Sequence, residues 1–205
     1  VAEPEEAVDW RAMPRRFVYH SRRVAAQPLP IRHEDRSQRC RLDDAALRPD
    51  GGGQVMITAT ADVLVFEEID RVYQFVALDF VTNYPRWSPE VVSLEPLSAG
   101  PVRTGFQARQ VRVDQGHKSE SVFAVVQLEP LKRICFEGVS APYRSIYEFA
   151  DQGSATSLSF TFELEALEPR IRPFEKLVRI AVQDGARRTV RKLKLLIEKQ
   201  MLDNG

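Results

Sequence analysis

The 205-residue sequence has few cysteines, no long apolar run and no net charge. Its two cysteines, Cys40 and Cys135, cannot build the disulfide framework of a small secreted scaffold, and their spacing is not that of zinc ligands. No run of about twenty apolar residues could cross a membrane or form a signal core. Because 29 basic side chains balance 29 acidic ones, the whole chain has no electrostatic attraction for DNA. We therefore expect a cytoplasmic protein that binds neither DNA nor a metal.

Composition divides the chain at the run Arg48-Pro49-Asp50-Gly51-Gly52-Gly53. Residues 1–53 hold ten Arg, no Lys, nine acidic residues and five Pro, and their apolar residues follow neither a strand nor a helix period. Such a segment cannot build a packed face, so we expect a poorly ordered extension at 1–53 and a folded domain at 54–205. The arginine-rich extension also fits a start site assigned too far upstream, with the true start near Met56.

Hydrophobic periodicity in the folded part predicts one strand, two short helices and then six more strands. Apolar residues alternate over residues 55–65 and recur at three- and four-residue spacing over 69–80. Further strand patterns, bounded by turn residues, cover 91–97, 106–113, 121–128, 133–139, 144–150 and 156–167. Their connections of four to eight residues are too short for parallel crossovers. We therefore predict an α+β fold with a seven-stranded antiparallel sheet.

The last predicted element is a helix over residues 172–202, which would span roughly 45 Å. Its apolar positions follow steps of four, as expected of a helix lying across a twisted sheet. The middle of this stripe is small, at Ala181, Gly185, Ala186 and Thr189, and both ends are bulky. A strongly bent sheet cannot approach the middle of the helix as closely as its ends. We therefore predict a cavity between helix and sheet, with close packing around the small residues as the alternative.

Several short strings resemble a known family. An acidic residue, Asp79, is followed by Tyr84-Pro85-Arg86-Trp87-Ser88-Pro89, and the run 100–105, the turn 128–130 and the run 191–198 are also similar. Over about residues 55–201 the chain resembles the START-like or birch-pollen-allergen-like (SRPBCC) superfamily, closest to its polyketide cyclase/dehydrase-like branch. This resemblance implies a helix-grip fold, in which a curved sheet wraps around the long C-terminal helix. It also implies a hydrophobic pocket, used in different members for lipid or sterol carriage, hormone binding or closure of a polyketide ring.

The residues expected to face this pocket are aromatic or small: Tyr84, Trp87, Phe106, Phe136, Tyr147, Phe149, Phe160, Phe162, Ala181 and Gly185. Core packing is the alternative for the phenylalanines, because any sheet needs apolar bulk on its buried face. Tyr84 and Trp87 would either gate the mouth of the pocket or pin a turn onto the sheet. A buried Tyr147 hydroxyl must find a partner, either in the protein or on a carbonyl of the ligand.

Candidates for catalysis are few, namely Tyr147, Arg109, Arg112 and Asp79. The two arginines have opposite parity on one predicted strand, so one should face inward, where it could hold an oxyanion or enolate. Asp79 would act as a base or cap a helical turn that begins near Phe80. His117 falls in a turn expected to be solvated, and no Ser/His/Asp or Cys/His motif is visible. The sequence therefore does not decide whether the protein is an enzyme.

Charge is unevenly distributed along the folded part, with a net of minus six over residues 54–170 and plus six over 171–202. Arg187, Arg188, Arg191 and Lys192 fall in the second half of the predicted helix, where cations also suit the helix dipole. This basic segment is either a solvated helix face or a docking surface for RNA, the ribosome or an anionic membrane.

Together these observations favour binding or carriage of an apolar small molecule, which would be a lipid, an isoprenoid or a polyketide-like compound. A polyketide cyclase or dehydratase that uses the same cavity is the alternative, and association with RNA or a membrane surface is a second alternative. We expect no cofactor, and the sequence leaves both a monomer and a homodimer open.

Overall fold

The computed structural model describes residues 56–114, 116–165 and 172–204. It begins with β1 (Ile57–Val65), α1 (Ile69–Tyr73), the π-helical turn η3 (Gln74–Leu78) and α2 (Phe80–Trp87). Six strands follow: β2 (Val91–Pro96), β3 (Gln107–Asp114), β4 (His117–Glu129), β5 (Arg133–Gly138), β6 (Tyr143–Asp151) and β7 (Thr156–Leu164). A 3₁₀ turn, η4 (Arg172–Phe174), leads into the long helix α3 (Glu175–Asn204). The expected boundary at residue 53 lies outside the described residues and stays a prediction.

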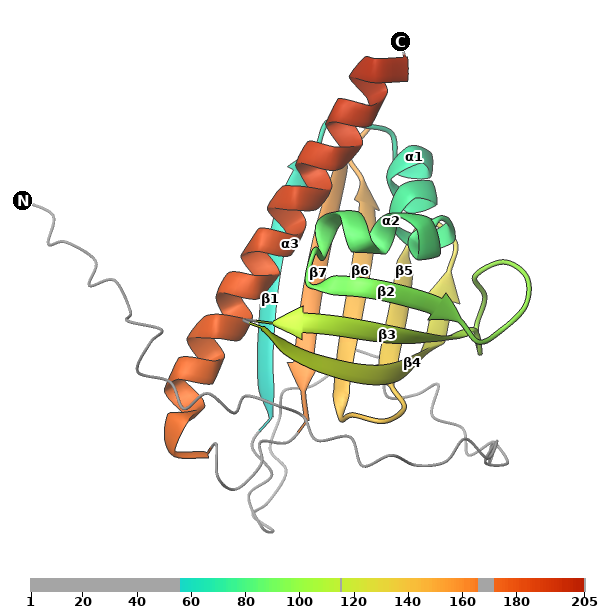
Figure 1. Ribbon diagram of the computed structural model, residues 1–205. Helices are drawn as coiled ribbons and strands as arrows, with labels where there is room; N and C mark the ends of the chain where they lie inside the picture. The colour runs from blue at the N-terminus through green and yellow to red at the C-terminus, as the bar shows by residue number, and fades with distance from the viewer. Residues whose placement is uncertain (1–55, 115, 166–171, 205) are drawn as a thin grey trace, which may run out of the picture.

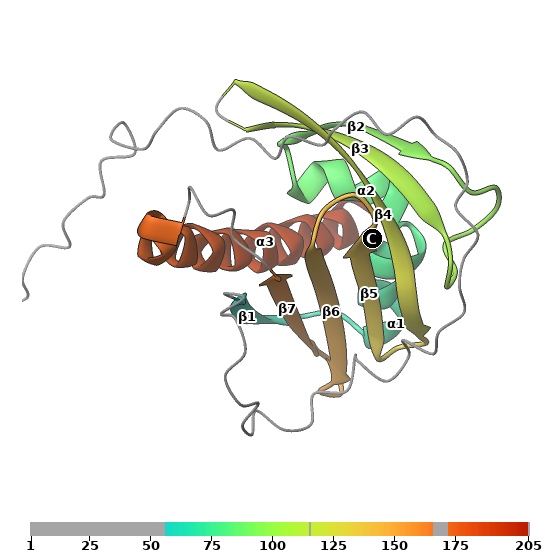
Figure 2. The same cartoon turned by 90° about the horizontal axis from the view of Figure 1, so that it is seen from below.

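The seven strands form one antiparallel sheet in the order β1-β7-β6-β5-β4-β3-β2. Successive strands are neighbours except that β1 pairs with β7, so β1 and β2 are the two edges. The sheet is strongly curved, so that β2 to β4 run across the direction of β1, β7 and β6 (Figures 1 and 2). A bulge between Val125 and Gln127 of β4 contributes to this bend. These features confirm the predicted α+β helix-grip fold.

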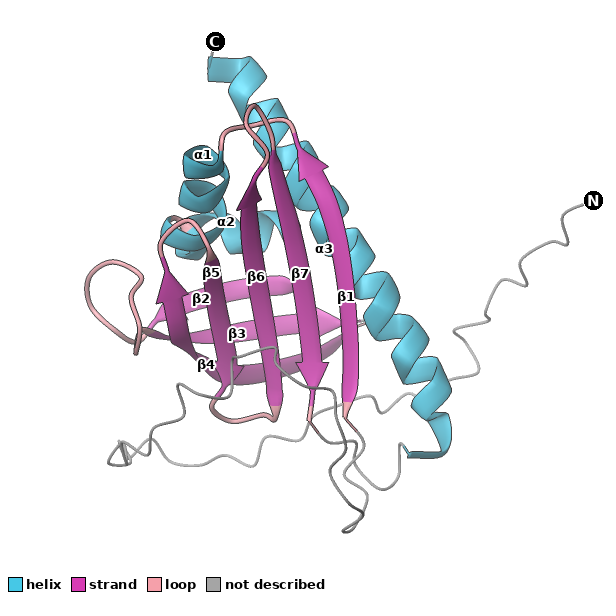
Figure 3. Ribbon diagram, turned by 180° about the vertical axis from the view of Figure 1, so that it is seen from behind, coloured by secondary structure: helices cyan, strands magenta, loops and turns pink. Residues whose placement is uncertain are grey.

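The long helix α3 lies along the open side of the curved sheet, next to β1 (Figures 1 and 3). Its side chains donate hydrogen bonds to backbone carbonyls of this edge: Arg179 to Met56 (3.3 Å), Gln183 to Thr60 (2.9 Å) and Lys194 to Leu64 (2.7 Å). In this way the helix covers an edge strand that would otherwise be open to another chain. The helix begins at Glu175 and not at 172, because residues 172–174 form the 3₁₀ turn.

The main hydrophobic core fills one end of the space between the concave face and the helices. Phe80 of α2 lies at its centre, with ring centroids 4.2 Å from Phe136, 5.9 Å from Phe123 and 5.9 Å from Trp87. The C-terminal half of α3 closes this core with residues that include Leu193. The aromatic residues are thus concentrated at one end of the concave face, and the other end is less filled.

Candidate functional site

A cavity of about 260 Å³ separates the middle of α3 from the sheet, and we call it the helix chamber. Gly185 marks this space, because a Cβ atom added there would meet no atom within 4 Å outside its own helix segment. The helix chamber is lined by Tyr84, Trp87, Ser88, Glu90, Arg112, Asp114, Ser145, Tyr147, Phe160, Phe162, Ala181, Val182, Gly185, Ala186, Arg188, Thr189 and Lys192. Gly185 therefore faces open space, whereas the adjacent Ala186 is buried and also packs in the main core.

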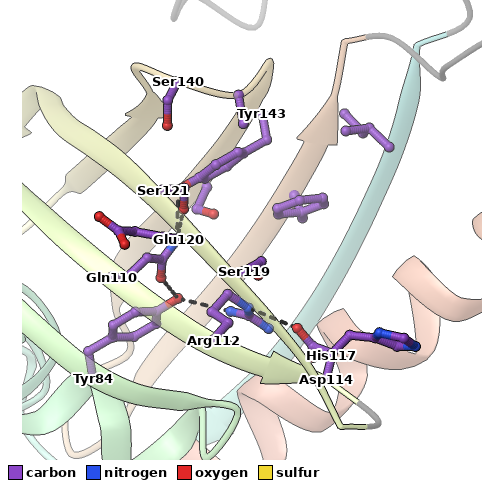
Figure 4. A pocket seen from close by; sticks show the side chains of 14 residues that line it. Tyr84, Gln110, Arg112, Asp114, His117, Ser119, Glu120, Ser121, Ser140 and Tyr143 are labelled. Carbon is purple, nitrogen blue, oxygen red and sulfur yellow. Dashed lines mark hydrogen bonds and ion pairs between the residues drawn. The ribbon is translucent and has the colours of Figure 1, made fainter. Parts of the chain in front are cut away.

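An adjoining space of about 270 Å³, the hairpin chamber, extends toward the turn between β3 and β4 (Figure 4). It is lined by Tyr84, Gln110, Arg112, Asp114, His117, Ser119, Glu120, Ser121, Ser140, Ala141, Tyr143, Ser145, Phe162 and Leu164. Five residues line both chambers: Tyr84, Arg112, Asp114, Ser145 and Phe162. The two chambers are therefore parts of one divided cavity.

A hydrogen-bonded network lies where the two chambers meet (Figure 4). Arg112 Nη1 donates to the Tyr84 hydroxyl at 3.4 Å, and that hydroxyl lies 3.3 Å from Oε1 of Gln110, to which it donates. The amide nitrogen of Gln110 donates to the hydroxyls of Ser121 and Tyr143, both at 3.0 Å. Gln110 is only 4 % exposed, so its amide depends on these partners. The network holds the polar side chains of this wall in fixed orientations.

Arg112 brings a positive charge to the cavity wall. Its side chain is 30 % exposed, and its Nε lies 3.4 Å from the carboxylate of Asp114. Burial alone would lower the pKa of Arg112, but Tyr84, Asp114 and Glu90 outweigh burial and raise the pKa above its ordinary value. The guanidinium therefore remains charged, which suits it to polarise a carbonyl oxygen or to hold an anionic oxygen.

The inner end of the helix chamber is aromatic and centres on Tyr147. This residue is 2 % exposed, and its hydroxyl accepts a hydrogen bond from the indole nitrogen of Trp87 at 3.3 Å. The ring of Phe160 lies 4.8 Å from that of Tyr147, and the ring of Phe136 lies 6.2 Å away. Burial, together with the nearby Tyr84, raises the pKa of Tyr147. The Tyr147 hydroxyl is therefore neutral at physiological pH.

Eight of the ten residues expected to bind a ligand line this region. Trp87, Tyr147, Phe160, Ala181 and Gly185 line the helix chamber, Tyr84 and Phe162 line both chambers, and Phe136 lines a small void of about 20 Å³ behind them.

The two other expected residues, Phe106 and Phe149, line neither chamber. Phe106 is fully buried in the main core, and Phe149 packs against Tyr73 with ring centroids 5.3 Å apart. Core packing, the alternative raised for the phenylalanines, describes the positions of these two.

Only some of the four catalytic candidates lie at the cavity. Arg112 faces the cavity, whereas Arg109 lies on the opposite face of β3 and pairs with Glu95 at 3.5 Å and Glu120 at 3.3 Å. Asp79 is exposed at the N-cap position of α2, where its side chain makes no capping hydrogen bond, and it lines neither chamber. Of the four candidates, only Tyr147 and Arg112 lie at the cavity.

Sequence reasoning missed Gln110, Tyr143 and Ser145, which share strand parity with residues that it did predict. Gln110 lies two residues before Arg112 on β3, and Tyr143 and Ser145 lie four and two residues before Tyr147 on β6. Residues an even number of positions apart on a strand face the same side. Polar side chains at buried positions of a strand were the available signal. His117 is not in a solvated turn but begins β4, where it pairs with Asp114 and lines the hairpin chamber.

Neither a metal centre nor a membrane span occurs in the part of the chain that the structure describes. No group of three or more His, Cys, Asp or Glu side chains there could hold a metal ion. None of the helices described has both the length and the apolar character needed to cross a bilayer.

The fold and the divided cavity define a helix-grip protein that encloses a space of small-molecule size. Residues 47–198 match the model of the family described as polyketide cyclase/dehydrase and lipid transport, so the chain belongs to that family. No curated protein matches the chain at a significant level.

Several solved structures are similar in fold. The Zhui aromatase/cyclase of a Streptomyces species has a TM-score of 0.60 and 14 % identity, with 72 % of this chain and 96 % of that chain covered. Norcoclaurine synthase of Thalictrum flavum, determined with a transition-state analogue, has a TM-score of 0.58 and 11 % identity over 74 % of this chain and 99 % of that one. The protein TTHA0849 of Thermus thermophilus has a TM-score of 0.56 and 19 % identity over 70 % of this chain and 98 % of that one. At these identities the likeness shows the fold alone.

Proposed function

We propose that the protein binds and carries an apolar small molecule, such as a lipid, an isoprenoid or a polyketide-like compound, in the divided cavity. The observation that carries this proposal is the open space in front of Gly185, opposite the aromatic wall of Phe160 and Phe162. An apolar guest there would bury its surface against rings and small helix residues. The description of the family, which includes lipid transport, supports the same function.

The proposal is tested by filling the helix chamber from the helix side. In Gly185→Leu the new side chain enters the chamber, and we expect affinity for an apolar fluorescent probe to fall by at least about tenfold, the equivalent of about 1.4 kcal/mol. Lys176→Leu, which adds a leucine at an exposed position of the same helix, is the matched control and should bind as the wild type does. Circular dichroism of both variants checks that the fold is intact. Equal binding by the two variants would place the ligand elsewhere.

A second candidate is a cyclase- or dehydratase-type enzyme, which the charged Arg112 on the cavity wall favours. Such an enzyme would fold a polyketide-like chain by the shape of the cavity and polarise a carbonyl with Arg112 or Tyr147. Native mass spectrometry of gently purified protein separates the two functions. A co-purifying ligand that is released unchanged supports carriage, whereas turnover that Tyr147→Phe abolishes supports the enzyme.

A basic strip on α3, beside the helix chamber, favours an additional role in docking. Arg188 and Lys192 line the helix chamber, and with Arg187 and Arg191 they form a basic strip. Leu195, on the next turn of the same strip, is 67 % exposed. An anionic bilayer attracts cations and also accepts an apolar side chain such as Leu195, so this combination suits a bilayer surface better than RNA. A bilayer is also where an apolar cargo would come from. We propose that this strip docks the protein on anionic lipid.

Vesicle flotation tests the docking role. We expect binding to vesicles that contain phosphatidylserine, none to phosphatidylcholine vesicles, and a loss of about 1 kcal/mol for each of Arg188→Gln, Arg191→Gln and Lys192→Gln. Lys118→Gln/Lys132→Gln, which removes exposed cations elsewhere, is the control. Binding to RNA without binding to anionic vesicles would overturn this proposal.

We also propose a cytoplasmic location and a protein that is a monomer or a homodimer. Fractionation of cells that express the full chain tests the cytoplasmic location, and light scattering distinguishes the monomer from the homodimer.

A further inference from the structure

One hydrogen-bond donor at the inner end of the helix chamber lacks an acceptor. The Tyr147 hydroxyl accepts from Trp87, but no acceptor for its own proton lies among the residues that the structure describes. Tyr147 is also almost completely buried. Buried donors in native proteins are nearly always paired, because a hydroxyl without a partner forfeits its hydration. A ligand in the chamber would supply the missing acceptor.

The Ser145 hydroxyl stands next to Tyr147 on the same face of β6. It lines both chambers, and it too has no hydrogen-bond partner among the described residues. Residues two apart on a strand point to the same side, so both hydroxyls are presented to the same end of the cavity. Phe162 pairs with Ser145 in the sheet and Phe160 pairs with Tyr147, so apolar rings frame the two donors.

The other polar groups of the inner wall are paired with one another. The amide of Gln110 bonds to Tyr84, Ser121 and Tyr143. Arg112, nearer the outside, has Tyr84 and Asp114 as partners. Tyr147 and Ser145 are therefore two neighbouring neutral donors on β6 that stay available to a ligand beside the rings of Phe160 and Phe162.

We propose that the ligand carries an uncharged hydrogen-bond acceptor, a ketone or ester oxygen, at its inner end and that this oxygen accepts from Tyr147 with support from Ser145. This inference rests on the proposed binding function and specifies its ligand. An uncharged oxygen suits this end better than a carboxylate, because none of the described residues that line the small void beside Tyr147 is a cation and a buried charge without a partner is costly. Arg112, which lines the helix chamber, already pairs with Asp114. The raised pKa of Tyr147 keeps its proton available for donation.

Two probes of closely matched shape test the inference, 2-acetylnaphthalene with a carbonyl and 2-isopropenylnaphthalene, in which a CH2 group replaces the carbonyl oxygen. We expect wild-type protein to bind the ketone about five- to tenfold more tightly in calorimetric titrations, as one neutral hydrogen bond would give. In Tyr147→Phe this preference should vanish, with the affinity for 2-isopropenylnaphthalene kept. Tyr73→Phe is the matched control, because Tyr73 is buried but lines neither chamber, and its preference should equal that of the wild type.

The carbonyl stretching band of bound 2-acetylnaphthalene gives a readout that does not depend on Tyr147→Phe, a variant that removes the acceptor of the Trp87 hydrogen bond and so lowers stability. We expect the band in wild-type protein at lower frequency than in hexane, and Ser145→Ala should reduce the shift. A band at the hexane position, or equal affinity of wild-type protein for the two probes, overturns this inference and leaves the binding function standing. Failure of both probes to bind would remove the binding function as well.

Discussion

The two halves of α3 pack against different parts of the molecule. In the C-terminal half, residues 190–204, Val190, Leu193 and Ile197 are all buried in the main core. In the N-terminal half, residues 175–189, Val178 is buried in a separate small cluster with Ile57 and Leu164, and Ala186 reaches the edge of the main core. Between these two contacts lie Ala181 and Gly185, which border the helix chamber.

The hydrogen bonds and ion pairs of α3 also differ between its two halves. Near the C-terminal end, Glu198 accepts from Lys194 at 2.6 Å and from the backbone nitrogen of Phe66 at 2.9 Å, while the Lys194 ammonium lies 4.3 Å from the ring centroid of Phe66. In the N-terminal half, Arg179 and Gln183 bond only to carbonyls on the edge strand and, for Arg179, to Glu175. The C-terminal half therefore packs into the core, whereas the N-terminal half is held mainly at the β1 edge and forms a cavity wall. Stability is commonly given up for function at such a wall.

The largest expected effect compares core truncations in the two halves. Leu193→Ala should lower the free energy of unfolding by about 2–5 kcal/mol, because it leaves a cavity in the main core. Val178→Ala should cost only about 1–2 kcal/mol, since it removes fewer methyl groups from a small cluster. Urea denaturation measures both. An equal or larger loss for Val178→Ala would contradict the division between the halves.

A sharper comparison uses two adjacent residues that differ in surroundings. Ala186 borders the helix chamber but is 1 % exposed and belongs to the main core, so the larger side chain of Ala186→Leu meets packed side chains and should destabilise the protein by about 1–3 kcal/mol. Gly185→Leu places the same side chain in open space and also gains helix propensity, so stability should be unchanged or raised by up to about 1 kcal/mol. Thermal unfolding of the two variants measures the contrast. A comparable loss in both would mean that the helix chamber is closed in solution.

Much of the fold follows from the sequence because alternation and turn residues act locally. Leu158 and Phe160 alternate with Ser157 and Ser159, and β7 is formed with those apolar residues buried. The start of β4 was predicted four residues too late, because Ser119 and Ser121 face a cavity and not a dry core, and the polar start of the strand resembles a loop. Gly116, with φ of 84°, makes a turn tight enough for Asp114 to pair with His117.

The site was only partly predictable, because parity gives the face of a strand but not the distance between strands. Parity implied that either Arg109 or Arg112 faces inward, and the structure identifies Arg112. The contact of Gln110 with Tyr143 joins residues on β3 and β6 that lie three strands apart. That contact depends on the curvature of the sheet, which no local pattern encodes. The same curvature places Phe106 and Phe149 in the core and Phe162 at the cavity.

The smallest expected effect concerns the carboxylates of the two halves and depends on pH. Burial alone would raise the pKa of Glu198, but the hydrogen bonds from Lys194 and Phe66 and the charge of Lys194 outweigh burial and lower it. The unfolded pKa of a Glu side chain is about 4.3. A carboxyl whose pKa is lower in the folded chain stabilises the fold at pH values above the unfolded pKa. This contribution to stability is lost as the pH falls through the folded pKa. Because the side chain is 26 % exposed, we expect Glu198→Gln to cost only about 0.5–1 kcal/mol at pH 7.

The difference in unfolding free energy between wild type and Glu198→Gln should therefore shrink toward zero below about pH 4. Glu175→Gln is the counterpart in the N-terminal half, where Glu175 pairs with Arg179 at 2.7 Å on the surface. An exposed pair four residues apart on a helix contributes about 0.3–0.5 kcal/mol, and added salt should weaken it. Urea denaturation from pH 3 to 7 measures both variants. A larger effect of Glu175→Gln, or a Glu198→Gln effect that does not change with pH, would show that the carboxylate contacts do not follow the division seen in the packing.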